Sequence, residues 1–361
     1  MRTTAIMEQL KHILAGLLVG LSTVSVAQQG RIVVQHAGNV QVFTDLTEAI
    51  LAAQPNADLY LSGGSFLVPG GFALDKTLHF IGAGVHPDTS GATGGTVLAT
   101  GSTSFFRLTT GANGSSFHGI RFNVPASSVC FGLGTGAGDQ DVVSVEFHRC
   151  QFQQGVNLGA VGVANSSSAF VECIFNRIVN GFDGSAQFTR CIFDYQAGTG
   201  AEISNFGVNG LVVLNSVCLG TRIGNSPGAV AENSVFTRTN APFWQSGGMQ
   251  IRNNVLVSGA LTSNMSGFVE SGNILSVPAG IIFQLEGDDN YQFSDDLHLQ
   301  TICPGVGAGT DGTDVGIYGT DSPYKDGAAP HTPHFERIGC SGATNAAGDL
   351  PVRIRVAAQA N

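Results

Sequence analysis

Five charged residues in the middle of the chain are of types that could cut an acidic polysaccharide. They fall between positions 177 and 202 and are Arg177, Asp183, Arg190, Asp194 and Glu202. Carboxylates on neighbouring turns of a chain can hold a Ca²⁺ ion against a uronate, and an arginine can take the proton next to the uronate carboxyl, as a polysaccharide lyase requires. Inverting glycoside hydrolysis would instead need two carboxyls about 6.5–9.5 Å apart. The alternative is that all five are ordinary solvated charges on exposed corners.

Two aromatic residues are candidates for sugar binding. The first is Trp244, in a loop-like stretch at 240–248, and the second is Tyr195. An aromatic ring with a polar edge can act as a platform at an exposed face, although a tryptophan in a loop also anchors that loop by packing. The acidic doublets Asp288-Asp289 and Asp295-Asp296 are interpreted as solvated loop, because no His-Gly or arginine partner follows them.

The seven cysteines favour packing and one disulfide over a metal site. Cys150, Cys173 and Cys191 recur at one position of a repeated motif, where we expect them to stack as small buried residues. No CxxC pair or histidine at ligand spacing accompanies them, so no metal is predicted there. Cys303 and Cys340 lie outside the repeats and are the candidate disulfide in an oxidising compartment. The odd number of cysteines leaves the connectivity open.

A short motif recurs down the middle of the chain and must position these residues. It has apolar inward positions, a two-residue corner, a small residue and, two positions later, a large apolar residue. The last position of the motif moves from residue 122 to residue 275 in seven steps, a mean of about 22 residues, and falls at Phe122, Phe152, Phe175, Phe193, Cys218, Phe236, Leu256 and Leu275. This period predicts the coils of a parallel β-solenoid, in which the phenylalanines of successive coils stack.

The corner of the motif prefers residues that tolerate a left-handed backbone. In five units the second corner residue is glycine or asparagine: Gly119, Asn215, Asn233, Asn253 and Gly272. These types adopt positive φ most readily, which predicts a tight bend. Three other units carry Arg149, Glu172 and Arg190, whose alternating sign predicts a solvated salt-bridge ladder along the outer corner.

The two ends of the chain indicate export and capping. Residues 1–27 have the basic start, apolar core and small-residue cleavage site of a signal peptide, which predicts that the protein is secreted or associated with the cell envelope. Residues 28–320 are assigned to the solenoid and residues 321–361 to a short tail that ends in a β-strand. Within 44–55, a capping box that begins at Asp45 predicts a short amphipathic helix covering the open end of the solenoid.

The first strands are expected just after this helix, and the residues around them resemble a known family. The entry, Asp58-Leu59-Tyr60-Leu61-Ser62-Gly63-Gly64 and Phe80-Ile81-Gly82-Ala83-Gly84, is similar to that of exported bacterial β-helix proteins of the pectate-lyase-like superfamily. The stretch from His298 to Gly319 resembles their closing coil. The resemblance implies an all-β, single-stranded, right-handed parallel β-helix of about ten coils. It implies no reaction, because one fold carries many functions.

The composition of the chain limits which partners the protein is expected to bind. The chain has a net charge of −10 and only 12% charged residues, so nucleic acid is not an expected partner. The apolar stretch near the N-terminus is short for a membrane span, and none is expected in the mature chain. We therefore expect a non-catalytic protein with a structural role or a role in contacting extracellular polysaccharide, without a cofactor. The alternative is a polysaccharide lyase or glycoside hydrolase, for which Ca²⁺ would be the cofactor of a lyase.

Overall fold

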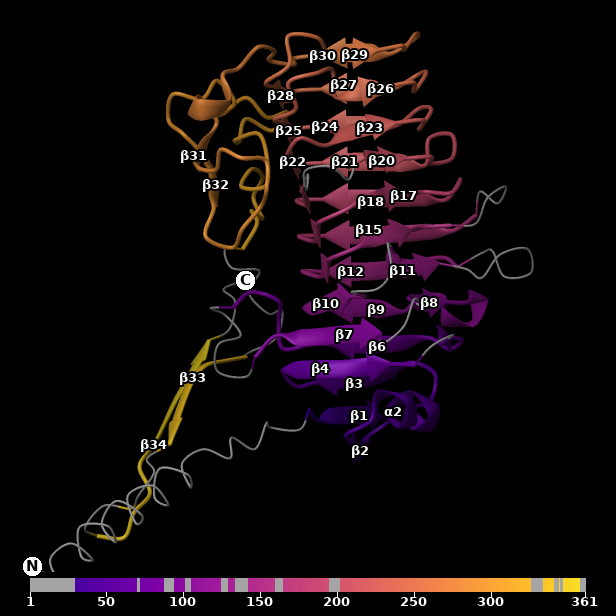
Figure 1. Ribbon diagram of the computed structural model, residues 1–361, viewed down its shortest axis with the longest axis vertical. Coiled ribbons are helices and arrows are strands. Elements are labelled where there is room, and N and C mark those ends of the chain that lie inside the picture. The colour runs from indigo at the N-terminus through magenta and orange to yellow at the C-terminus, as the bar shows by residue number, and fades with distance from the viewer. Residues whose placement is uncertain are drawn as a thin grey trace, which may run out of the picture.

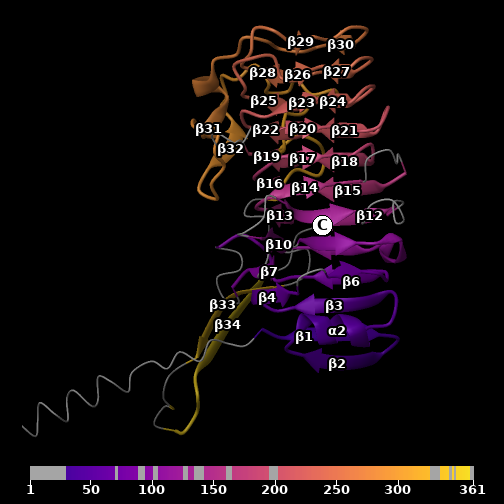
Figure 2. The ribbon, with the colours of Figure 1, turned by 45° about the vertical axis from the view of Figure 1, so that its right-hand side comes forward.

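The computed structural model forms a right-handed parallel β-helix, as the repeats and the resemblance predict (Figures 1 and 2). It describes residues 30–69, 72–87, 94–100, 105–124, 129–133, 142–159, 165–194, 202–325, 334–340, 344 and 347–357. Nine coils each contribute one strand to each of three sheets, here called A, B and C, and the last coil contributes a strand to sheet A alone. Ten strands of sheet A run parallel, which agrees with the expected number of coils.

Three sheets run along the whole stack. Sheet A contains, in spatial order, β2 (Asn39–Phe43), β1 (Ile32–His36), β3 (Ala57–Leu61), β6 (Leu78–Ile81), β9 (Ser116–His118), β12 (Val145–His148), β15 (Ser167–Val171), β18 (Ser185–Thr189), β21 (Leu211–Leu214), β24 (Val230–Glu232), β27 (Gln250–Arg252) and β30 (Val269–Ser271). Sheet B contains β4 (Gly64–Val68), β7 (Thr96–Thr100), β10 (Ile120–Asn123), β13 (Gln151–Phe152), β16 (Ile174–Phe175), β19 (Ile192–Phe193), β22 (Val217–Cys218), β25 (Val235–Phe236) and β28 (Val255–Leu256). Sheet C contains β5 (Ala73–Leu74), β8 (Phe106–Leu108), β11 (Val129–Leu133), β14 (Gly155–Asn157), β17 (Val179–Asn180), β20 (Glu202–Ser204), β23 (Arg222–Gly224), β26 (Phe243–Trp244) and β29 (Thr262–Ser263).

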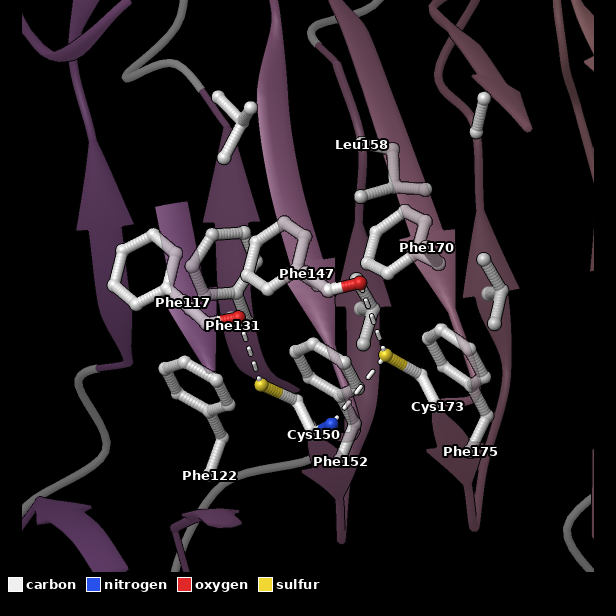
Figure 3. Close-up of a cluster of buried hydrophobic side chains, with 14 of the residues drawn as sticks. Phe117, Phe122, Phe131, Phe147, Cys150, Phe152, Leu158, Phe170, Cys173 and Phe175 are labelled. Atoms are coloured by element: carbon white, nitrogen blue, oxygen red, sulfur yellow. Dashed lines mark hydrogen bonds between the residues drawn. The ribbon is translucent and has the colours of Figure 1, made fainter. Parts of the chain in front are cut away.

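Aromatic ladders fill the interior of the stack, as the motif predicts (Figure 3). The ring centroids of Phe122, Phe152, Phe175 and Phe193 are separated by 5.0, 4.9 and 5.1 Å in turn, with nearly parallel planes. Beside them the predicted cysteine ladder is fully buried, and the thiol of Cys150 donates to a backbone carbonyl of the preceding coil, 3.4 Å away. Small residues are needed there because the aromatic rings occupy the remaining volume.

The corners between sheets A and B have the predicted left-handed backbone. The φ angles of Asn215, Asn233 and Asn253 are 48°, 52° and 48°. Arg149 and Glu172 adopt the same conformation, with φ of 53° and 56°, although their residue types disfavour it. The geometry of the coil therefore overrides residue preference at these two positions.

The N-terminal end of the stack is closed by a helix and a hairpin. Helix α2 (Leu46–Ala52) begins at Asp45, whose side chain accepts a hydrogen bond of 2.9 Å from the backbone N–H of Glu48, which confirms the predicted cap. The expectation that the first strands follow the helix is wrong: β1 and β2 precede it and pair antiparallel with each other. Their turn is made by Ala37 and Gly38, both at positive φ.

Residues 277–325, here called the lobe, lie beside the stack along the outer face of sheet B (Figure 2). The lobe contains a short 3₁₀ turn, η2 (Ala279–Ile281), and two antiparallel strands, β31 (Phe283–Leu285) and β32 (Asp296–Leu299); another 3₁₀ turn, η1 (Thr110–Ala112), lies in the stack. The segment that was expected to form the closing coil is part of this lobe. Its apolar side chains cover a row of outward residues on sheet B: Ile174, Ile192, Val217, Val235 and Val255.

The tail forms a separate two-stranded hairpin, β33 (His334–Cys340) with β34 (Val352–Ala357), which extends away from the stack (Figure 1). The predicted terminal strand is therefore present. Among the described residues, no helix has the length and apolar character that a membrane crossing requires.

Candidate functional site

The five charged residues proposed for catalysis lie on different sides of the coil. Asp183 is exposed in the turn from sheet C to sheet A, and Arg190 lies at the corner from sheet A to sheet B. Asp194 comes directly after strand β19 of sheet B, whereas Glu202 is the first residue of strand β20 in sheet C. Arg177 and Asp194 are close enough to influence each other. The structure thus does not gather the five into one cluster.

Asp194 belongs to a buried ladder of polar side chains. Its carboxylate accepts hydrogen bonds from the side-chain amide of Asn176 at 2.8 Å and from the backbone N–H of Tyr291 in the lobe at 3.1 Å. Gln151 in turn donates to Asn176 over 3.0 Å. Burial raises the pKa of Asp194, and nearby Asp288 adds to the rise. Asp194 therefore links the stack to the lobe and is not open to a polymer.

Arg190 belongs to a second buried network, which corrects the prediction of a solvated ladder. The Nε atoms of Arg149 and Arg190 lie 2.6 and 3.4 Å from the carboxylate of Glu172, as the alternating signs predict. However, only 3% of the side-chain surface of Glu172 is exposed. The lobe reaches this corner. Burial raises the pKa of Tyr324, the charge of Glu172 adds to the rise, and Tyr324 belongs to the same buried apolar cluster as Ile174.

Glu202 and Trp244 do come together, through an arginine that sequence reasoning missed. Glu202 and Arg222 are directly opposite on β20 and β23, and Nη2 of Arg222 donates to the carboxylate over 3.0 Å. The guanidinium carbon of Arg222 lies 4.4 Å from the centre of the Trp244 ring. A β-carbon on Gly224 would collide with the Glu202 carboxylate and lie 3.1 Å from the indole, so glycine makes room for this cluster.

The spacing of these residues is the signal that could have revealed the cluster. Arg222 follows Glu202 by 20 residues and Trp244 follows Gly224 by 20, which is one coil in each case. Arg222 and Gly224 are two residues apart and so share one face of β23. Residues one coil apart lie side by side in a solenoid. The loop-like composition around Trp244 obscured the short strand β26, in which Phe243 points into the core and Trp244 points outward.

An uncharged row leads to this cluster along the outer face of sheet C. Each member is the registered neighbour of the next on six successive strands: Asn157, Asn180, Ser204, Gly224, Trp244 and Ser263. On five of these strands the preceding residue points into the core, so the row itself points outward. Ser204 and Gly224 are nevertheless buried, and the members open to solvent are Asn157, Asn180, Trp244 and Ser263. Neighbouring members are about 4.8 Å apart, the spacing of paired strands.

A groove of about 380 Å³ lies beside Trp244 at the end of this row. Its lining includes Arg222, Arg238, Asn240, Thr262 and Ser263. Arg238 donates from Nη1 to the backbone oxygen of Gly220 at 3.1 Å, while its buried Nε has no partner within the described part of the chain. The groove therefore combines an aromatic ring with several hydrogen-bond donors and acceptors.

The remaining predicted site residues are not brought into this groove. Tyr195 lies outside the described residues. Cys303 is a buried free thiol, and the side chain of Cys340 is not among those described, so the expected disulfide between them is not shown. Within the described ranges, no group of three or more histidine, cysteine or acidic side chains is arranged to hold a metal ion.

Comparisons with known proteins do not assign this chain to a family. No family model, no curated protein and no solved structure matches the chain. What the molecule does must therefore be inferred from its own residues.

Proposed function

We propose that the protein is a non-catalytic parallel β-helix protein that binds an extended glycan along the outer face of sheet C. The observation that carries this proposal is the Glu202–Arg222–Trp244 cluster at the end of the uncharged row. A long polar face with an aromatic ring at one end suits a linear polymer, because hydrogen bonds can repeat along it while the ring supplies a contact for a sugar face.

The arrangement of charges favours binding over bond cleavage. Glu202 forms an ion pair with Arg222. The other two predicted carboxylates, Asp183 and Asp194, belong to different segments of the coil and do not face Glu202. Hydrolysis by an inverting route would need such a second carboxylate about 6.5–9.5 Å away. The alternative is a lyase or hydrolase, which would cleave the polymer and release products, whereas a binding protein would not.

Export and membership of the pectate-lyase-like superfamily are part of the same proposal. Their support is the signal-peptide pattern at residues 1–27 and the motifs at the entry of the β-helix. A protein at the cell surface or outside the cell would meet polysaccharide. We accordingly propose a secreted or envelope-associated location.

Glycan binding can be tested by affinity electrophoresis of the purified protein through gels that contain neutral or uronate polysaccharides. We expect retardation by at least one polymer and its loss in Trp244→Ala, since the variant removes the large aromatic surface on which a sugar face would pack. Tyr60→Ala is the matched control, because Tyr60 is an exposed aromatic on sheet A. Equal loss in both variants, or no retardation by any polymer, would contradict the proposed face.

The same polymers can separate binding from catalysis. Incubation with and without Ca²⁺, followed by assays for new reducing ends and unsaturated products, should yield no products. Ca²⁺-dependent unsaturated products would instead assign the protein to the polysaccharide lyases, and new reducing ends alone would indicate a hydrolase.

A further inference from the structure

We propose that the C-terminal hairpin of one copy docks onto the acidic lobe of a second copy, so that the protein self-associates. The hairpin is β33 with β34, and the lobe is residues 277–325. The proposal is independent of glycan binding, because it uses the lobe and the tail, not sheet C.

In the part of the tail that the structure describes, strand β34 exposes its apolar side chains to solvent. Val352, Ile354 and Val356 expose 52, 58 and 56% of their surface, and Arg353 and Arg355 between them are exposed as well. Both faces of β34 are therefore open to solvent. An isolated two-stranded hairpin is marginally stable in water and gains stability from a third strand or a packed face. We infer that another surface covers this one.

Charge identifies the surface that fits. Strand β34 has two arginines and no acidic residue, although the whole chain has a net charge of −10. The lobe has eight acidic residues and one lysine, a net charge of −7, against a net charge of −10 for the whole chain. Opposite net charges on two surfaces favour their encounter and set their orientation.

The lobe also offers a groove of matching composition. The groove has a volume of about 420 Å³, and its lining includes Phe283, Leu285, Glu286, Asp288 and Asp295. Leu285, which exposes 61% of its surface above the buried ring of Phe283, can pack against the branched aliphatic side chains of β34, and the carboxylates can pair with its arginines. Burial raises the pKa of both Glu286 and Asp295, and the neighbouring charge of Asp288 adds to each rise. A cation beside these carboxylates would relieve their mutual repulsion.

Pairing between two hairpins fits less well. If β34 paired antiparallel with β34 of a second copy about Ile354, then Arg353 of each chain would lie opposite Arg355 of the other. Like charges at directly opposite positions are destabilising. In the structure the hairpin extends away from its own stack (Figure 1), which leaves it accessible to the lobe of another molecule. Reciprocal exchange of two hairpins would close a dimer.

The test is the molar mass of the purified full-length protein, measured by sedimentation over a range of concentrations. We expect reversible association that weakens at least about tenfold between low and high salt, because screening shortens the reach of the charges. Arg353→Glu in the hairpin and Asp288→Lys in the groove should each weaken association by a similar factor. An equimolar mixture of these two variants should recover it, because each then supplies the charge that the other has lost.

The matched control is Glu146→Lys, which makes the same change of charge at an exposed site on sheet A. We expect this variant to associate like the parent. Circular dichroism should show an intact β-helix in all three variants, because none of these side chains belongs to either core. A monomer at every concentration would overturn the proposal. Association that neither Arg353→Glu nor Asp288→Lys weakens, or that the mixture fails to restore, would overturn it as well.

Discussion

Glu172 has a left-handed backbone at a corner of the coil, and its side chain lies between those of two arginines. A left-handed backbone costs a residue with a β-carbon roughly 1–2 kcal/mol, and Gly119 and Asn215 avoid much of that cost in other coils. Glu172 offsets it through contacts with Arg149 and Arg190, which occupy the equivalent corners of the coils on either side. Each of the three residues thus tolerates an unfavourable backbone because its neighbours carry the opposite charge.

Removing the charge of Glu172 should therefore be costly. In Glu172→Gln, two buried guanidiniums lose their common counterion, and breaking a buried ion pair by removing one partner typically costs about 3–5 kcal/mol. We expect a fall of about 3 kcal/mol in the free energy of unfolding, measured by urea denaturation. Glu146→Gln, on the exposed face of sheet A, should change it by less than about 0.5 kcal/mol. Similar values for both variants would mean that the Glu172 network contributes no more than a surface ion pair.

The sequence predicted the charges of this network but not its burial, and the reason is the distance along the chain. The pairing follows from residues one coil apart, which the repeat makes visible. The lobe residue that reaches this corner is Tyr324, more than 150 positions after Glu172, and no local pattern connects the two. Asp194 shows the same limit, because its partner Tyr291 also comes from the lobe. Sites shaped by a distant segment are the ones that a repeat pattern cannot define.

At the scale of elements, the strands of sheet B did carry a signal for the lobe. In Cys173-Ile174-Phe175 and Cys191-Ile192-Phe193, three apolar residues follow one another. Side chains alternate along a strand, so the middle residue must point away from the core in which its neighbours lie. A row of outward aliphatic residues over several coils requires a covering element. The lobe supplies it, as the burial of Ile174 and Ile192 shows.

A charge in this outward row should loosen the lobe while leaving the stack intact. In Val235→Asp, docking of the lobe would bury an unpaired carboxylate, which costs several kcal/mol, so the lobe should open more often. We expect at least about tenfold faster proteolysis within residues 277–325, followed by mass spectrometry. Gln187→Asp is the control, since Gln187 is exposed on sheet A. Cleavage that begins within the coils, or equal rates in both variants, would show that the lobe is not held by this row.

At the scale of the whole molecule, negative charge is unevenly distributed, and part of it is buried where the lobe meets the stack. Burial raises the pKa of Asp194 above its ordinary value of 3.8 and that of Glu286 above 4.5. Asp288, in the lobe, adds to both rises, whereas Arg177, in the stack, opposes the rise at Asp194. The surroundings of Asp194, where the stack meets the lobe, and those of Glu286 within the lobe therefore favour the protonated carboxyls, unlike a typical salt-bridged surface.

These shifts predict the direction in which pH changes stability. A carboxyl with a raised pKa in the folded state binds protons more tightly there than in the unfolded chain, so the free energy of unfolding falls as pH rises. The fall should begin near the ordinary carboxyl pKa and end above the raised pKa of the folded state. Asp296, whose pKa is lowered by its contact with His298, contributes with the opposite sign at lower pH. Urea denaturation across this range should show greater stability on the acidic side.

Asp194→Asn isolates the contribution of Asp194 to this dependence. The amide keeps an acceptor for the backbone N–H of Tyr291, which lies 3.1 Å from the carboxylate in the parent protein, but it no longer titrates. We therefore expect a smaller loss of stability with rising pH in the variant than in the parent, and a smaller difference between them in acid than at neutral pH. The two profiles would run parallel if Asp194 were as solvated as a surface carboxylate. In that case its pKa would not be raised, and the negative charge at this interface would not limit how firmly the lobe is held.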